Sequence, residues 1–579
     1  MTRRSYAAGA LLVLALALSA CVSLPTSGPV VESSTSNRAD ARRASDIDAR
    51  SPAKGATRSE IVTGFLDAMT AWPIQTSVAK EYLTEEAAAG WNPEQETIIY
   101  SDSLPVHESA GSVSVQLTAA DRLDQVGAWR GAIGDEALTL SFRLTVDHGE
   151  YRIADPPDAL VVPASWFRQR YRQVSLYYFD PLAKILVPEP VFVPEGDQLA
   201  SSLVSALLAG PPPLARGVVR SFLPPGLSVG LSVPVDDQGV AHVSLVGEGS
   251  KVTSEQAELM LAQLAWTMRQ DPTIEALRVT VDGTDLPLPG GASKYSVQSA
   301  ASFDPAGPGS GRQLIGLSRG RLFTGTLGDL SPASGAFGDV DAGLDTVAVR
   351  PDLELAAAVD DNGHRVRIAP VREVSDQPVP RTLLSGGDYV RPTWDNAGRL
   401  WILERRPGGA AVWLDDHNGL RQLDVPGITG SRAHALLVSR DGTRLLAVVR
   451  GAGGDEVVGV RVLIGGRGQV LQTRPPVVIR PPEGSRISDI AWTGPTRIGL
   501  LTPTAPGSLY EVDVASADGA TVGVDVASTI VSGKVLDLAG SPVADAPMLA
   551  VYADRYFDLA RQASYDPGSM VLSQLDYTG

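Results

Sequence analysis

The chain has 579 residues, of which 44% are hydrophobic and 20% charged, and its formal net charge is −17. This length predicts several domains rather than one, and the apolar content is sufficient for several buried cores. The acidic balance argues against a nucleic-acid-binding protein, because neutralising phosphates requires clustered Lys and Arg.

The first 20 residues have the pattern of a signal peptide. Arg3 and Arg4 form a short basic region, and an apolar stretch follows at residues 7–18. This stretch is too short to span a bilayer, which needs roughly 20 residues. No second apolar run in the chain is long enough for a membrane helix, so we expect everything after residue 20 to lie outside the cell. The rest of a twin-arginine signal is missing.

The apolar stretch ends in Leu18-Ser19-Ala20-Cys21, which resembles the bacterial lipobox. The resemblance implies that the signal peptidase recognises the first three residues and that Cys21 carries an S-diacylglyceryl group and an N-acyl group. Cys21 is the only cysteine, which also excludes internal disulfides; an ordinary signal peptide that happens to contain a cysteine is the alternative. Acyl chains contribute about 0.8 kcal/mol per buried methylene. We therefore expect the protein to be held on the outer face of the plasma membrane.

Residues 21–56 are rich in Ser, Ala, Pro, Asp and Arg and lack apolar periodicity, so we expect a disordered tether. A flexible coil of this length would place the first domain on the order of 30 Å from the membrane. That reach would suit contact with another membrane protein, and it equally fits a simple spacer.

Residues 57–165 are predicted to form an α+β domain. Thr57 and Glu60 resemble a capping box, and apolar residues then recur at helical spacing. A second short helix is predicted at 76–83, and a hairpin at 140–153. Helices followed by a curved antiparallel sheet are similar to NTF2-like domains.

Residues 166–300 alternate strands and helices. Strands are expected at 174–179, 185–194, 240–245 and 277–281, and helices at 199–208 and 255–268. The prolines within 185–194 suit an edge strand or a bend, and we expect Ser254 to cap the second helix.

Three strings in this segment are similar to the GerMN domain of sporulation and germination proteins. They are Tyr177-Tyr178-Phe179, the helix end Leu207-Leu208-Ala209-Gly210-Pro211, and the strand end from Leu277 to Gly283. The glycine releases the helix and the prolines prevent its continuation. These residues are architectural, so the resemblance identifies an α+β fold and marks no active site.

Weak repeats run through residues 310–579. Asp- and Gly-containing turns precede apolar strands at a spacing of roughly 45–53 residues, the scale of a four-stranded propeller blade. We expect a β-propeller of about five blades, or six if residues 312–327 and the C-terminal tail complete another. A β-sandwich is the alternative architecture.

The sequence offers no convincing catalytic or metal-binding constellation. None of the six histidines has an H-x-x-x-H or H-E-x-x-H partner, so zinc hydrolysis is unsupported. They are His107, His148, His242, His364, His417 and His434. The absence of a second cysteine excludes a thiolate metal site. We expect no catalytic residue, no metal and no cofactor.

Three further motifs have simpler explanations. The G-x-S-x-G matches at 226–230 and 316–320 lie among predicted strands and loops, whereas a nucleophile elbow requires a strand, a turn and a helix. Residues 360–363 resemble the start of a calcium loop but lack the distal glutamate, so a hairpin turn is predicted. Among Trp394, Trp401, Trp413 and Trp492, the first and last occupy equivalent repeat positions, which favours core packing over ligand contact.

The order of lipobox, tether, NTF2-like domain, GerMN domain and propeller resembles LpqB-type lipoproteins of actinobacteria. The resemblance implies a partner, the external domain of the sensor kinase in an MtrA–MtrB two-component system, and a role in cell-envelope homeostasis and division. The residues themselves favour a non-enzymatic binding protein, because extracellular domains with many loops need no catalytic group for specificity. There are two alternatives. The chain could be a receptor for cell-wall glycan or peptide, or an envelope hydrolase with a site assembled across domains.

Overall fold

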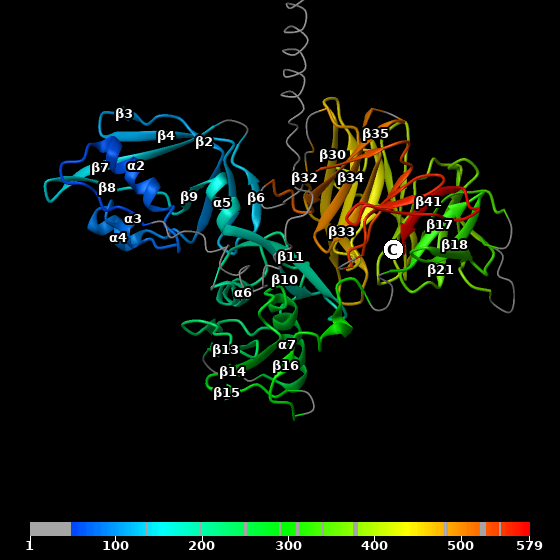
Figure 1. The fold of residues 1–579 in the computed structure, drawn as a ribbon, viewed down its shortest axis with the longest axis horizontal. Coiled ribbons are helices and arrows are strands. Elements are labelled where there is room, and N and C mark those ends of the chain that lie inside the picture. The colour runs from blue at the N-terminus through cyan, green and yellow to red at the C-terminus, as the bar shows by residue number, and fades with distance from the viewer. Residues whose placement is uncertain are drawn as a thin grey trace, which may run out of the picture. The chain divides into compact units, whose positions relative to one another are not determined.

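The computed structural model describes residues 48–134, 137–196, 198–247, 252–288, 291–307, 312–338, 341–373, 380–479, 481, 484–505, 507–521, 528–543 and 546–579 (Figure 1). From Asp48 onward these residues belong to one compact unit. Cys21 and most of the tether lie outside the described residues, so their assignment stays a prediction. Within the described ranges, no helix is both long and apolar enough to cross a membrane.

The N-terminal domain combines helices and strands, as predicted, but its strands form two sheets, one of which includes a parallel pair, instead of a single antiparallel sheet. Its helices are α2 (Arg58–Ala68), α3 (Ser77–Lys80), α4 (Glu85–Gly90) and α5 (Ala164–Arg170). Its strands are β1 (Glu96–Tyr100), β2 (Asp102–Ser103), β3 (His107–Ser109), β4 (Ser112–Thr118), β5 (Asp121–Asp124), β6 (Trp129–Ala132), β7 (Leu138–Asp147), β8 (Glu150–Ile153) and β9 (Leu160–Pro163). The sheet orders are β6-β5-β1-β9 and β2-β4-β7-β8, with β3 paired to β4. The more specific NTF2-like assignment stays a prediction.

Local signals in this domain place most elements correctly. The capping box is confirmed, since the backbone N–H of Thr57 donates to Glu60 Oε2 at 2.7 Å and the Thr57 hydroxyl accepts from the Glu60 N–H. The hairpin is also confirmed, because β7 pairs with β8. The helix predicted at 76–83 is shorter at its C-terminal end and spans Ser77–Lys80. Leu83 instead forms a β-bridge with Ile153.

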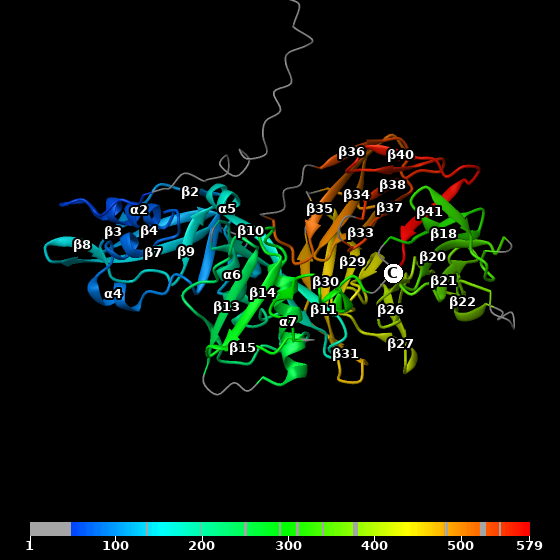
Figure 2. The same cartoon turned by 60° about the horizontal axis from the view of Figure 1, so that its bottom comes forward.

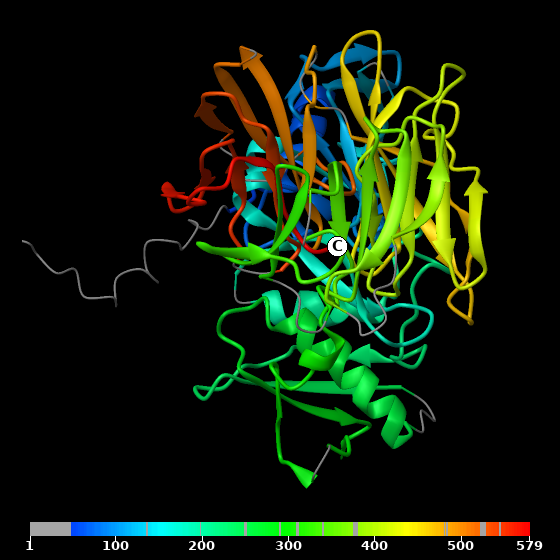
Figure 3. The same cartoon turned by 90° about the vertical axis from the view of Figure 1, so that its right-hand side faces the viewer.

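The middle domain begins with a two-stranded hairpin and continues as a sheet covered by helices (Figure 3). The hairpin strands are β10 (Tyr171–Phe179) and β11 (Leu186–Pro194). The remaining elements are α6 (Leu199–Leu208), β12 (Ser228–Val229), β13 (Val240–Val246), α7 (Ser254–Met268), β14 (Ala276–Val281), β15 (Thr284–Asp285), β16 (Tyr295–Ser296) and the short 3₁₀ helix η4 (Ala301–Phe303). Strands β13 and β14 are parallel, and α7 is the crossover between them.

One predicted cap in the middle domain is wrong by a single residue. Thr253, not Ser254, caps α7: its backbone is extended, and its hydroxyl accepts from the Gln256 N–H at 3.2 Å. Both candidates carry a hydroxyl, so only the backbone conformation decides which one is the cap. The predicted helix end is confirmed, because α6 stops at Leu208 and Gly210 follows with a φ of 86°.

The third domain is a β-propeller. Its strands are β17 (Leu314–Ser318), β18 (Arg321–Thr326), β19 (Asp329–Pro332), β20 (Leu344–Val349), β21 (Leu355–Asp360), β22 (Arg365–Pro370), β23 (Arg381–Ser385), β24 (Thr393–Trp394), β25 (Leu400–Glu404), β26 (Ala411–Asp416), β27 (Gly419–Leu423), β28 (Ala433–Val438), β29 (Arg444–Arg450), β30 (Asp455–Ile464), β31 (Val470–Thr473), β32 (Val477–Ile479), β33 (Asp489–Gly494), β34 (Arg497–Ala505), β35 (Leu509–Ser516), β36 (Thr529–Ser532), β37 (Asp537–Ala539), β38 (Leu549–Val551), β39 (Tyr556–Asp558), β40 (Ala563–Tyr565) and β41 (Leu572–Tyr577).

In the described part of the propeller these strands form six sheets, where the repeats alone suggest five. Five sheets take consecutive strands, starting at β20, β24, β28, β33 and β37. The other sheet joins β17–β19 to β41, so that the last strand of the chain pairs with the first strand of the propeller (Figure 2).

The Asp/Gly turns of the repeats have a local cause. Asp395 Oδ1 accepts from the backbone N–H groups of Ala397 and Arg399 at 3.0 and 3.1 Å, and Asp441 Oδ1 accepts from the Thr443 N–H at 2.8 Å. Such Asx turns close a chain reversal without help from the rest of the fold. The turns are therefore visible in the sequence even where the strands are degenerate.

Candidate binding sites

A pocket of about 200 Å³ lies where the first strands of five propeller sheets meet β41. Every sheet contributes to its lining, and polar side chains dominate it. They are Thr346, Arg391, His434, Ser488, Asp489, Asp537, Ser573 and Gln574. The pocket is smaller than the several hundred Å³ of typical small-molecule sites.

One arginine joins four sheets at this pocket. Arg391 Nη1 lies 3.0 Å from Asp537 Oδ1 and 3.3 Å from Asp576 Oδ2, while its Nη2 lies 3.0 Å from Asp489 Oδ1. Burial alone would lower the pKa of Arg391, but the three carboxylates raise it. The three ion pairs of Arg391 connect the four sheets. The cluster has three carboxylates and one guanidinium, so negative charge is in excess.

Two of the three carboxyl groups have raised pKa values. Burial raises the pKa of Asp576 to about 6 and that of Asp489 well above its ordinary value, although the Arg391 charge opposes both shifts. No group of three or more His, Cys, Asp or Glu side chains in the described residues could hold a metal ion. The arrangement suits a structural ion network, and its open side could take a small cationic group.

The raised pKa of Asp576 predicts a loss of stability with rising pH. The ordinary value is 3.8 and the folded value about 6, so within this window the unfolded chain releases a proton that the folded chain keeps. The free energy of unfolding then falls as pH rises and levels off above the folded pKa. Asp576→Asn cannot titrate, so its melting temperature should fall less than that of the parent between about pH 4.5 and about pH 7.5. Equal pH dependence in both proteins would contradict the assignment.

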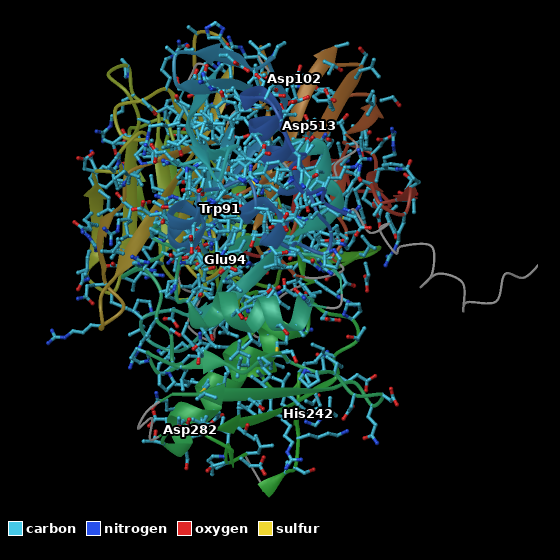
Figure 4. The ribbon with its side chains drawn as sticks, turned by 90° about the vertical axis from the view of Figure 1, so that its left-hand side faces the viewer. Trp91, Glu94, Asp102, His242, Asp282 and Asp513 are labelled. Atoms are coloured by element: carbon cyan, nitrogen blue, oxygen red, sulfur yellow. The ribbon has the colours of Figure 1, made fainter. Side chains whose placement is uncertain are left out.

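The middle domain has a larger cavity, of about 910 Å³. Its lining comes from the start of α6, from residues 232–239 and from the turn after α7, and it includes four acidic residues: Asp236, Asp237, Asp271 and Glu275. Asp236 Oδ2 lies 3.1 Å from His242 Nε2, and backbone donation by Val240, followed by the bond to His242, lowers the pKa of Asp236. Figure 4 labels His242 on this domain. Hydroxyls and carboxylates at an open cavity can bind polar ligands such as sugars or peptides.

The two serines of the G-x-S-x-G matches do not form nucleophile elbows. Ser228 lies in β12 and its hydroxyl donates to the Val246 carbonyl at 3.3 Å. Ser318 ends β17 and its hydroxyl accepts from the Val571 N–H at 3.2 Å. Both serines are strand residues, as the spacing of the surrounding pattern suggests.

The segment that resembles a calcium loop is a hairpin turn. Asp360 pairs with Arg365 at 2.7 Å, and it also contacts Arg367. Asp361, Asn362 and Gly363 all have positive φ values between β21 and β22. The carboxylate of Asp360 is therefore committed to arginines, and the hairpin prediction is confirmed.

The repeat tryptophans pack in the core, as predicted. Trp394 and Trp492 are 4% and 5% exposed. Each indole N–H donates to a carbonyl of the preceding sheet, Trp394 to Ala348 at 3.3 Å and Trp492 to Val438 at 2.8 Å. Their equivalent positions in the repeat thus reflect one structural role, that of linking neighbouring sheets.

Sequence reasoning missed the Arg391 cluster, although a signal for it exists. Arg391, Asp489 and Asp537 each stand three residues before the aligned repeat positions Trp394, Trp492 and Gly540. Equivalent positions in the blades of a propeller lie at the same distance from its axis. An arginine and two aspartates at one equivalent position are therefore expected to lie close together near the centre.

Comparison with known proteins places three family matches along the chain. The N-terminal domain of lipoprotein LpqB matches residues 51–168, the sporulation and spore germination (Germane) domain matches 175–287, and the lipoprotein LpqB beta-propeller domain matches 320–534. Lipoprotein LpqB of Thermobifida fusca is 28% identical over 557 residues, covering 86% of this chain and 87% of that protein. Lipoprotein LpqB of Streptomyces coelicolor is 25% identical, covering 95% and 93%.

Two solved structures show more distant likeness. TolB from Acinetobacter baumannii has a TM-score of 0.32 at 11% identity, covering 61% of this chain and 99% of that chain. The tandem GerMN domains of the sporulation protein GerM from Bacillus subtilis have a TM-score of 0.19 at 16% identity, covering 27% and 58%. At such TM-scores neither likeness carries a functional conclusion.

Proposed function

Because this chain belongs to the LpqB family of actinobacterial lipoproteins, we propose that it is a non-enzymatic, lipid-anchored extracellular protein that modulates a sensor histidine kinase. The kinase is of the MtrA–MtrB type, and the role is in cell-envelope homeostasis and division. The family match across all three domains is the observation that carries the proposal. The kinase partner follows from the resemblance to this family.

The geometry supports a binding role in two ways. The propeller joins its strands through many exposed loops, which can give specificity without catalytic groups. The charged groups at the propeller pocket bond one another across the sheets, and each G-x-S-x-G serine bonds a backbone group. The hydrolase alternative is therefore the least supported by the described residues.

The first experiment measures binding of residues 21–579, carrying Cys21→Ser, to the purified external domain of the same organism's MtrB-like kinase. We expect saturable binding at micromolar or lower concentration. The external domain of an unrelated sensor kinase serves as the control and should not bind. Absence of binding by a demonstrably folded kinase domain would overturn the kinase proposal.

The lipid anchor gives a separate prediction. In living cells, Cys21→Ser should move the protein from the membrane fraction to the soluble extracellular fraction and abolish labelling by a fatty-acid analogue, because the acyl acceptor is lost. The neighbouring change Ser23→Ala should leave both unchanged. Membrane retention of the Cys21→Ser protein after a high-salt wash would show that another element anchors it.

The cavity of the middle domain favours a second candidate function, direct binding of cell-wall glycan or peptide. Its volume of about 910 Å³ suits a ligand of a few sugar or amino-acid units. We expect purified wall fragments to bind the parent, and the pair of changes Asp237→Asn and Glu275→Gln to weaken this binding about tenfold, since two exposed carboxylates are lost from the lining. Asp285→Asn, outside the cavity, is the matched control. If wall fragments bind the doubly substituted protein as tightly as they bind the parent, this cavity is not their binding site.

A further inference from the structure

The hairpin β10–β11 is a two-stranded sheet with almost no exposed residues. Such an isolated pair of strands is marginally stable in water, so its neighbours must hold it. Helix α7 covers part of it: Gln263 Nε2 donates to the Tyr177 carbonyl at 3.0 Å, and Tyr177 packs on Trp266. The rest of the hairpin contacts both the N-terminal domain and the propeller, and these two boundaries differ in chemistry.

The boundary between the hairpin and the N-terminal domain is apolar. The Phe192 ring lies 5.4 Å from that of Phe167 and 6.2 Å from that of Trp129. The Phe192 N–H donates to the Gly127 carbonyl at 2.8 Å. Gly127 has a φ of 80°, and a Cβ there would lie 2.2 Å from the Phe192 carbonyl oxygen, so the close approach of the two backbones requires glycine. The two domains keep separate cores, but Val126 and Ala128 pack in the core of the middle domain and Phe192 packs in that of the N-terminal domain, and this interlocking apolar contact holds them as a single body.

The boundary between the hairpin and the propeller is polar. Glu189 of β11 is 1% exposed, and its carboxylate receives Arg461 through both oxygens, with one Nη1–Oε1 distance of 2.8 Å. Arg444 lies 3.2 Å from the same carboxylate and also donates to the Pro188 carbonyl. Among the described residues, the apolar clusters of the first two domains take in only Leu463 and Ala520 from the propeller.

The polar boundary is also incompletely satisfied. Arg444 is 3% exposed and its Nη1 has no hydrogen-bond partner, and the fully buried hydroxyl of Tyr178 on the same hairpin has none either, within the described part of the chain. Removing charges from water offsets most of the attraction between them. Opening this boundary would rehydrate the carboxylate and both arginines, whereas opening the other would expose aromatic rings to water.

We propose that Glu189, Arg444 and Arg461 form an electrostatic latch between two rigid bodies, the fused N-terminal and middle domains on one side and the propeller on the other. With the latch closed the two bodies move together. With it open the propeller exposes an arginine pair, and the hairpin exposes a carboxylate. A ligand that prefers either state would shift their populations. The latch stands on these contacts alone and is independent of the kinase partner.

Distance measurements between spin labels test the latch. With Cys21→Ser the full chain is free of cysteine, so labels can be attached to cysteines replacing the exposed residues Asp102, Asp282 and Asp554. The 102–282 pair lies within the first body, and the 282–554 pair reports across the latch. In Glu189→Gln we expect the 282–554 distribution to broaden and its parental peak to fall at least twofold, while the 102–282 distribution stays unchanged.

Two further variants separate charge from misfolding. Arg461→Glu should broaden the 282–554 distribution as Glu189→Gln does, and the exchange Glu189→Arg with Arg461→Glu should restore the parental peak. Asp285→Asn, which breaks the exposed pair with Arg278, is the matched control and should change nothing. Three results would each overturn the latch: an unchanged 282–554 distribution in both single variants, equal broadening of the 102–282 pair, or failure of the exchanged pair to restore the peak.

Discussion

Replacing Arg391 with methionine should lower the free energy of unfolding of the propeller by about 3 kcal/mol. Methionine preserves much of the volume of the side chain but removes the cation that the carboxylates of Asp489, Asp537 and Asp576 share. One fifth of the Arg391 side chain is exposed, which places the cost at the lower end of the range for broken buried ion pairs. Denaturant unfolding at neutral pH measures the effect.

The acidic surroundings supply an internal check on this result. At about pH 4.5 Asp576, whose pKa is raised to about 6, is largely protonated, so Arg391→Met should cost less there than at neutral pH. Arg405→Met removes the exposed ion pair with Asp388 and should cost less than about 1 kcal/mol at either pH. If Arg391→Met and Arg405→Met lower the free energy of unfolding by the same small amount, the cluster does not hold the sheets together.

Deleting residues 572–579 should abolish the cooperative unfolding transition of the propeller. The deletion removes β41, including the buried side chains of Leu572, Leu575 and Tyr577, and leaves β17 as an unpaired edge. Burial of such side chains contributes about 1.5–3 kcal/mol each, so the three together contribute about 4.5–9 kcal/mol, which is comparable with the stability of a whole domain, about 5–15 kcal/mol. Calorimetry and near-ultraviolet circular dichroism measure it.

The point variant Val571→Ala is the matched control for the deletion. Val571 directly precedes β41 and is 53% exposed, so its truncation should change the free energy of unfolding by less than about 0.5 kcal/mol. A deletion protein that keeps the parental transition would show that the pairing of β41 with β17 is not needed to close the ring.

The parts of the fold that the sequence predicts depend on contacts between near neighbours. The capping box of Thr57 and Glu60, the turn at Asp360 and the repeat turns at Asp395 and Asp441 each bond within a few residues. The core role of the repeat tryptophans follows from their periodic placement. These features can be inferred because propensity and spacing determine them before tertiary packing acts.

The missed features depend on distant segments. The sixth sheet is predicted only as an alternative to five blades, because it pairs β17 with β41 across nearly the whole propeller sequence. Glu189 lies in a proline-containing strand that is typical of an exposed edge, yet it is buried against two arginines of the propeller. Arg391 finds its carboxylates on three other sheets. No local sequence pattern predicts contacts between segments that are far apart in the chain. Equivalent positions in the repeats do reduce the number of residue pairs that need to be considered.

The pairing of β17 with β41 also orders events during biogenesis. Under the proposed export to the cell exterior, the chain would cross the membrane from its N-terminus and be threaded in an unfolded state. The early propeller strands emerge first, but the sheet they begin is completed by residues 572–577. The ring can therefore close only after these last residues have emerged, and until then the early strands remain exposed to aggregation.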